Sequence, residues 1–225
     1  GNPDETARVV SQPVTVSKEI QHPLASLRDL IAMLVLPAAL WIGALAIVIA
    51  RRPFRAEALQ STRGTARIVA RSTITALGFG ALQVALALAV GALVGLPVAT
   101  LGWGAAIGLV ASFSFITLHT LGKLLWPRVT DLASIVLLVV QFVALPCIVP
   151  VEMLPEWMQP LANAFPLSWA TQAMQAAVSG EHVSTMLSRL VALALLGAAA
   201  TAVTTLVLSR RRLARGFGFA IATAN

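Results

Sequence analysis

Five largely uncharged apolar stretches, separated by short polar segments, dominate the hydrophobicity pattern of this chain. Each is close to the roughly 20 residues that an α-helix needs to cross about 30 Å of hydrocarbon. The pattern therefore predicts an all-α, polytopic membrane helical bundle with five transmembrane helices. The predicted spans are 30–50, 73–96, 99–121, 132–150 and 187–208.

The composition agrees with a protein dissolved in lipid. Hydrophobic residues make up 58% of the chain and charged residues 11%, whereas a soluble domain carries about 25% charged residues. The net charge of +7 comes from residues that flank the apolar stretches, as topology-determining charges do. No soluble face is left to carry a nucleic-acid stripe. Membrane lipid is thus an expected partner, and nucleic acid is not.

The basic residues fall mainly on one side of the predicted bundle. The rule that cytoplasmic loops carry the excess of Lys and Arg places that side in the cytoplasm. The N-terminus is then outside and the C-terminus is cytoplasmic. Of the 16 Lys and Arg residues, those assigned to the cytoplasm are Arg51, Arg52, Arg55, Arg63, Arg67, Arg71, Lys123, Arg128, Arg210, Arg211, Arg212 and Arg215.

The chain divides into three parts on this topology. Residues 1–24 are polar, and their partly alternating Val and Thr residues suggest a short strand at the extracytoplasmic end of a larger, missing outer domain. Residues 25–210 form the transmembrane bundle. Residues 211–225 form a cytoplasmic tail.

The basic segment 51–72 is the longest predicted cytoplasmic loop. Its FRAEALQ stretch is helix-prone, and Phe54, Ala58 and Leu59 can share one face of a short interfacial helix. The loop either tethers the chain to anionic lipid or docks a cytoplasmic partner.

Small residues and buried amides are the main features inside the spans. The pairs Gly91 and Gly95, and Gly104 and Gly108, have the small-xxx-small spacing that lets helix backbones approach closely. They indicate packing within the bundle or a dimer seam, with a pathway lining as the weaker alternative. The intramembrane polar residues Gln83 and Gln141 are expected to make interhelical hydrogen bonds, and contact with substrate is the alternative.

The segment 150–180 is apolar and aromatic but is interrupted by prolines. Because proline breaks a continuous helix, we expect a short outer re-entrant or interfacial helical hairpin in place of a sixth span. Gly180 is a candidate C-terminal cap of its second helix. The residues that define this outer segment are Pro150, Glu152, Pro155, Trp157, Pro166 and Trp169.

No catalytic, metal or cofactor motif accompanies these features. Ser114 and His119 are five residues apart on one span and do not share a face, so His119 is expected to reach toward the interface or to form a hydrogen bond there. The chain has no HExxH sequence and no phosphate loop that ends in GK followed by Ser or Thr. We therefore expect no enzyme activity, no cofactor and no ATP binding by the chain itself.

The sequence QFVALPCIVPVEMLPEWMQPLANAFPLSWATQAMQAAVSG resembles the outer re-entrant segment of ABC type-2 exporter permeases. With ARVVSQPVTV and LPAALWIGAL in the N-terminal half, the chain is similar to the C-terminal membrane domain of the bacterial YhgE/Pip family. One departure is Cys147-Ile-Val-Pro150, where that family usually has a Gly-rich turn.

The resemblance implies a permease domain that works as a homodimer or heterodimer of bundles in the bacterial plasma membrane. It would move a lipid-like, amphipathic or polypeptide cargo outward with a separate cytoplasmic ATPase. The alternative is a non-transporting anchor or scaffold for an outer domain in phage adsorption or a type VII-like secretion complex. The implied ATPase-coupling loop contains Arg52, Phe54, Arg55, Glu57 and Leu59.

Overall fold

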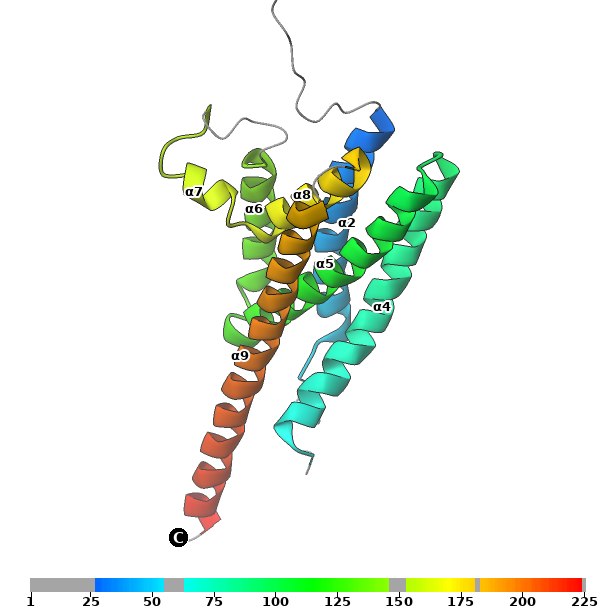
Figure 1. The fold of residues 1–225 in the computed structure, drawn as a ribbon. Helices are drawn as coiled ribbons and strands as arrows, with labels where there is room; N and C mark the ends of the chain where they lie inside the picture. The colour runs from blue at the N-terminus through cyan, green and yellow to red at the C-terminus, as the bar shows by residue number, and fades with distance from the viewer. Residues whose placement is uncertain (1–26, 55–62, 146–152, 181–182, 224–225) are drawn as a thin grey trace, which may run out of the picture.

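The computed structural model describes residues 27–54, 63–145, 153–180 and 183–223, and its regular structure is entirely helical (Figure 1). No strand occurs among these residues, and the strand suggested near the N-terminus lies outside them. The helices are α2 (Leu27–Arg51), α4 (Thr65–Leu93), α5 (Val98–Leu125), α6 (Thr130–Val143), α7 (Gln159–Ala162), α8 (Pro166–Ser179) and α9 (Val183–Thr223).

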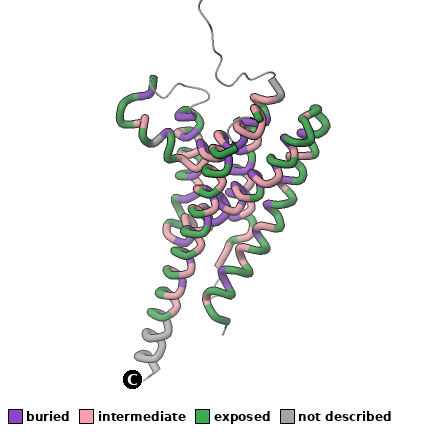
Figure 2. Tube along the Cα trace, in the orientation of Figure 1, coloured by how far each residue is buried: buried purple, intermediate pink, exposed green. Residues whose placement is uncertain are grey.

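Helix α5 lies at the centre of the bundle and packs against α2, α4, α8 and α9. The largest cluster of buried side chains contains Trp41 and Leu40 of α2, Phe115 of α5, Leu167 of α8 and Leu193 of α9. Figure 2 shows the buried residues gathered where these helices meet, while α4 is largely exposed. Hydrocarbon can cover those exposed apolar faces.

Four helices in the described part of the chain are long and apolar enough to cross a membrane: α2, α4, α5 and α9. They confirm four of the five predicted spans and a multi-pass membrane protein. The fourth predicted span, 132–150, differs because α6 has only 14 residues, or about 21 Å of helix. It ends three residues before Pro146, and the backbone before a proline disfavours helix.

Two helices are longer than the apolar pattern predicts. Helix α4 begins at Thr65, within the predicted loop 51–72, and α9 continues through the predicted tail to Thr223. The candidate span in α9 is Val183–Ala214. Hydropathy marks where hydrocarbon would begin and end, but a helix can continue beyond that boundary when its exposed side chains are polar.

The two ends of the bundle differ in composition. Arg and Lys residues gather near the ends of α2 and α5, near the starts of α4 and α6 and at Arg210–Arg212 of α9, and we call this the basic end. At the opposite end, which we call the proline-rich end, α8 lies across the bundle (Figure 1). Pro166 begins α8, and Gly180 ends it in the left-handed conformation with φ 69°. This confirms the predicted helix and its glycine cap.

Close helix contacts depend on small residues. A Cβ atom on Gly108 would lie 2.9 Å from a methyl carbon of Val84, so this member of the predicted Gly104 and Gly108 pair brings α5 against α4. A Cβ atom on Gly197 would lie 2.6 Å from the Phe113 ring and 3.1 Å from the Cα atom of Ser114. The contact between α5 and α9 therefore requires glycine at position 197.

Candidate functional site

Phe54, a predicted member of the coupling loop, joins the end of α2 to three other helices. Arg52 and Phe54 have positive φ angles of 45° and 64°, which turn the chain sharply after α2. Phe54 then packs against a buried cluster of Val69 from α4, Leu124 from α5 and Leu208 from α9. A displacement of this turn would therefore shift side chains of three other helices directly.

The coupling-loop prediction is only partly visible in the structure. Phe54 lies outside any helix, so it does not belong to the short interfacial helix expected from its spacing to Leu59. Arg55, Glu57 and Leu59 lie outside the described residues. What the structure adds is the anchoring of Phe54 in the bundle.

Two arginines of α9 fasten the basic end through backbone carbonyls. The guanidinium of Arg211 donates to the carbonyl of Leu124, in the last turn of α5, at 2.8 Å. Arg212 donates to the carbonyl of Arg63 at 2.8 Å and to Oγ1 of Thr65 at 3.1 Å, where α4 begins. The sequence identified both arginines only as topology signals, because their partners depend on how α9 is rotated against α4 and α5.

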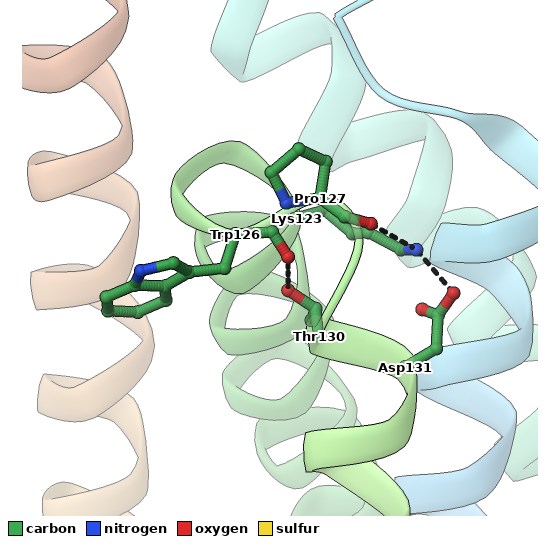
Figure 3. A network of polar contacts seen from close by, with 5 residues as sticks. All are labelled: Lys123, Trp126, Pro127, Thr130 and Asp131. Carbon is green, nitrogen blue, oxygen red and sulfur yellow. Dashed lines mark hydrogen bonds and ion pairs between the residues drawn. The ribbon is translucent and has the colours of Figure 1, made fainter.

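The turn between α5 and α6 carries a second polar network at the same end (Figure 3). Lys123 Nζ lies 2.5 Å from Asp131 Oδ2 and 3.4 Å from the carbonyl of Pro127. Thr130 Oγ1 donates to the carbonyl of Trp126 at 2.6 Å. The Trp126 ring points away from the ion pair (Figure 3). The network fixes the first turn of α6 to the last turn of α5.

The outer segment forms the two short helices that the prolines predict, α7 and α8. Trp169 Nε1 donates to the carbonyl of Asn163 at 2.7 Å, which closes the link between them. The carbonyl of Pro155 accepts from the amide of Met158 at 2.7 Å. Trp157 is 68% exposed. Pro150 and Glu152 lie outside the described residues.

Gln141, on α6, is fully buried and binds the first turn of α8. Its Oε1 accepts from the backbone amide of Leu167 at 3.1 Å. The first amides of a helix have no partner within the helix, and Phe165, at the N-cap, provides no side-chain cap. Gln141 thus supplies from another helix the cap that α8 lacks locally.

Gln83, on α4, makes the interhelical hydrogen bond expected of it. Its Nε2 donates to the carbonyl of Ala39 on α2 at 2.7 Å. The amide fits because residue 43 is glycine: a Cβ atom there would lie 2.0 Å from Nε2. Both predicted intramembrane amides therefore link helices.

Trp41 and His119 form the aromatic centre of the bundle. The Trp41 ring contacts Phe115 and His119 edge to face, with centroids 5.0 and 4.7 Å apart, and its Nε1 donates to the carbonyl of Ser134 at 3.2 Å. His119 is 2% exposed, so it does not reach toward an interface, which was the first of its two predicted roles; it makes a hydrogen bond instead, but to the carbonyl of Phe115 inside the bundle. A tryptophan in the middle of a span is the sequence signal for such a buried contact, since tryptophan usually lies at the membrane boundary.

Ser114 and His119 do not combine into a catalytic pair. Ser114 Oγ binds the carbonyl of Leu193 on α9, and His119 Nδ1 lies 2.5 Å from the carbonyl of Phe115. Each side chain thus uses a separate carbonyl. Among the described residues, no group of His, Cys, Asp and Glu is arranged to hold a metal ion.

The family model of the ABC-2 type transporter matches residues 16–178, a stretch that includes α2 and reaches nearly to the end of α8. No curated protein and no solved structure gives a significant match to the chain.

Proposed function

This chain belongs to the ABC-2 type transporter family and is a permease component of an ABC exporter, and we propose that it moves a lipid-like or other amphipathic cargo outward. A separate ATPase docks at the basic end and drives the transport. The observation that carries this proposal is the anchoring of Phe54, because it gives a docked protein a direct mechanical connection to the bundle.

The basic end is well suited to receive a cytoplasmic subunit. Most arginines of the chain lie at this end, and the rule that cytoplasmic loops carry the excess of Lys and Arg assigns it to the cytoplasm. Arg211 and Arg212 hold α9 to the end of α5 and the start of α4. A push on the loop that contains Phe54 would therefore move connected helices together.

The bundle interior favours a cargo with an apolar portion. Its buried polar side chains among the described residues are hydroxyls, one amide and one imidazole, and most of them bind carbonyls of the bundle itself. An ion would need compensating charges inside the membrane. An amphipathic molecule needs none along its apolar part. A polypeptide cargo remains part of the proposal only through its apolar segments.

A second copy, or a related chain, completes the proposed permease. Members of this family function as dimers with a cytoplasmic ATPase. The exposed apolar faces of α4, α6 and α9 are long enough to pack against a second bundle or to remain in lipid.

Site-specific photo-crosslinking tests the ATPase partner. A photoreactive amino acid replaces Ala56 in the loop or, as the matched control, Trp157 at the proline-rich end, and crosslinks are formed in intact membranes. We expect an ATP-binding subunit, identified by peptide mass spectrometry, to be captured from position 56 and not from position 157. Capture of no ATP-binding protein from any position in the loop would refute the coupling role.

Replacing Phe54 tests the mechanical connection. Phe54→Ala removes the contact with Val69, Leu124 and Leu208 but leaves the neighbouring charges in place. In proteoliposomes with the ATPase, we expect ATP hydrolysis to continue while transport falls by about tenfold. Phe54→Leu, which keeps an apolar anchor, should retain most of the transport. Equal transport in both variants would contradict the anchoring role.

We also propose, from the sequence resemblance, that the chain is close to the YhgE/Pip branch. A scaffold for an outer domain would then be the competing function. Replacing the transmembrane helices with an unrelated five-span anchor separates the two: a scaffold keeps its function, whereas a permease loses it.

A further inference from the structure

A mostly apolar cavity of about 260 Å³ lies between α2, α5 and α6 and begins at the turn that joins α5 to α6. Its lining includes Leu118, Leu121 and Leu125 of α5 and Ala133 and Leu137 of α6. Residues with this spacing share one face of a helix. Because Leu118 and Leu137 are each about two helical turns away from the joining turn, the cavity is elongated along the two helices.

This cavity is partly open to the outside of the bundle. Trp126, Val129 and Ala133 belong to its lining and are also exposed. Around a membrane bundle, hydrocarbon and not water meets such an apolar surface. A water molecule in a protein is held by two to four polar partners, and the hydroxyl of Thr130 in the lining already donates to the carbonyl of Trp126. The shape and the lining therefore favour an alkyl chain as the occupant.

The turn at the start of the cavity carries one cation that the bundle does not use. Arg128 is exposed and directly precedes Val129 of the lining. Among the described residues, no group forms an ion pair or a hydrogen bond with its side chain. The other cation of this turn, Lys123, is already paired with Asp131. Arg128 is therefore the charge of the turn that an anion from outside the protein can bind.

The cation, the aromatic ring and the apolar cavity follow one another in the order of the parts of a phospholipid. Tryptophan is enriched at the level of the headgroups, and Trp126, which is 64% exposed, lies in the same turn as Arg128. An acyl chain extends from the headgroup into the membrane, as the cavity extends from this turn toward Leu118 and Leu137. Basic pockets between membrane helices bind anionic headgroups at the cytoplasmic side of other proteins.

We propose that this cavity binds an anionic phospholipid of the leaflet at the basic end. One acyl chain lies in the cavity between Leu121 and Ala133, and the phosphate binds the guanidinium of Arg128. A zwitterionic lipid such as phosphatidylcholine carries its own cation beside the phosphate, so Arg128 favours the anionic lipid. The site needs neither an ATPase nor transport, and a bound chain would add apolar packing between α5 and α6.

Photolabelling of the full chain in phosphatidylcholine vesicles tests this site. The two probes are a phosphatidylglycerol and a phosphatidylcholine that carry the same acyl chain with a diazirine. Labelling of the cavity is measured by peptide mass spectrometry and normalised to labelling of the exposed Leu82 and Leu86 on α4. We expect saturable labelling of the lining that is about fivefold stronger for the phosphatidylglycerol, which is the attraction that one basic residue provides near a membrane surface.

Two variants assign the effect to the cavity and to Arg128. Ala133→Phe fills the cavity and should abolish saturable labelling of the lining, whereas Leu132→Phe, at an exposed neighbour outside the lining, should not. Arg128→Gln should make the two probes label equally. The matched control is Arg67→Gln, which removes an exposed cation from α4 and should keep the preference. Both arginines are exposed, so both substitutions should preserve the fold.

Equal labelling of the wild type by the two probes, or a preference that survives Arg128→Gln, would overturn the proposal. Absence of label from the lining would overturn it as well, because something other than lipid, such as a second copy of the chain, would then cover the cavity. Unchanged labelling in Ala133→Phe would show that the chain does not enter the cavity. If Ala133→Phe does not fold, the comparison of Arg128→Gln with Arg67→Gln still decides the matter.

Discussion

Helices α5 and α6 are consecutive and both apolar, yet they are held in the bundle by different means. Along α5 the buried residues include Ile107, Ala111 and Phe115, which pack against four other helices. Along α6 the buried residues are Thr130, Ser134 and Gln141, Leu137 and Leu138 pack half-buried against the core, and most of the other apolar residues face outward. Helix α5 is held mainly by apolar packing, whereas α6 combines limited apolar packing with polar contacts.

A cavity of about 260 Å³ lies beside α6, between this helix, α2 and α5. Three residues of α6 take part in directed contacts: the Thr130 hydroxyl with the carbonyl of Trp126, the backbone carbonyl of Ser134 with Trp41 Nε1, and the Gln141 side chain with the amide of Leu167. Such contacts hold a helix in position at single residues and do not fill the space between those residues. Hydropathy therefore predicts that a segment is in the membrane but not which of its residues face the protein.

The largest expected loss of stability comes from disturbing the packing of α5. Gly197→Ala places a Cβ atom against Phe113 and against the Cα atom of Ser114 on α5, and backbone cannot move aside as a side chain can. We expect a loss of about 1–3 kcal/mol in unfolding free energy, as is typical of overpacking, measured by SDS titration of the purified protein. Gly102→Ala, which meets no atom within 4 Å, is the control and should change little.

The next largest loss of stability is expected when a polar contact of α6 is removed. Gln141→Met removes the acceptor from the buried amide of Leu167, which should cost about 1–3 kcal/mol because that amide is left unpaired. Gln83→Met, the same change on α4, should cost less than about 1 kcal/mol because the carbonyl of Ala39 retains its partner within α2. Equal losses in the two variants, in the same SDS titration, would show that Gln141 does not cap α8.

The smallest effect is expected at the turn between the two helices. Asp131→Asn removes the negative charge from the ion pair with Lys123. The side chain of Asp131 is 41% exposed and that of Lys123 is 20% exposed. Exposed ion pairs contribute about 0–1 kcal/mol, so the midpoint of unfolding should hardly move. A large loss would mean that the ion pair, and not Thr130 and Gln141, holds α6 in place.

The sequence predicted most of the helices, and its errors have identifiable causes. The helices α2 and α5 agree with the predicted spans within a few residues, because their apolar and helical limits coincide. Helix α4 extends to Thr65 because Arg67 and Arg71 continue the helix beyond the apolar stretch. The end of α6 at Val143 could have been foreseen from Pro146, which the length of the apolar run concealed.

The type of contact that each site residue makes could be predicted from the sequence, but the residue that it contacts could not. Interhelical hydrogen bonds from Gln83 and Gln141 follow from the cost of burying an amide in a membrane. Their partners, Ala39 and Leu167, depend on the rotation of each helix about its axis. The same holds for Arg211, Arg212 and the anchoring of Phe54, which no local pattern indicates.

The central claim is that the short helix α6 helps to carry the chain across the membrane, from the basic end to the opposite face. Labelling of single cysteines on either side of α6 tests this claim most directly. In a Cys147→Ser background, Val129→Cys precedes α6 and Trp157→Cys follows it, and both parent side chains are exposed. An impermeant thiol reagent added outside intact cells should label position 157 and not position 129, and inverted vesicles should show the reverse. Labelling of both positions from the same face would contradict the five-span topology and the cytoplasmic placement of the basic end.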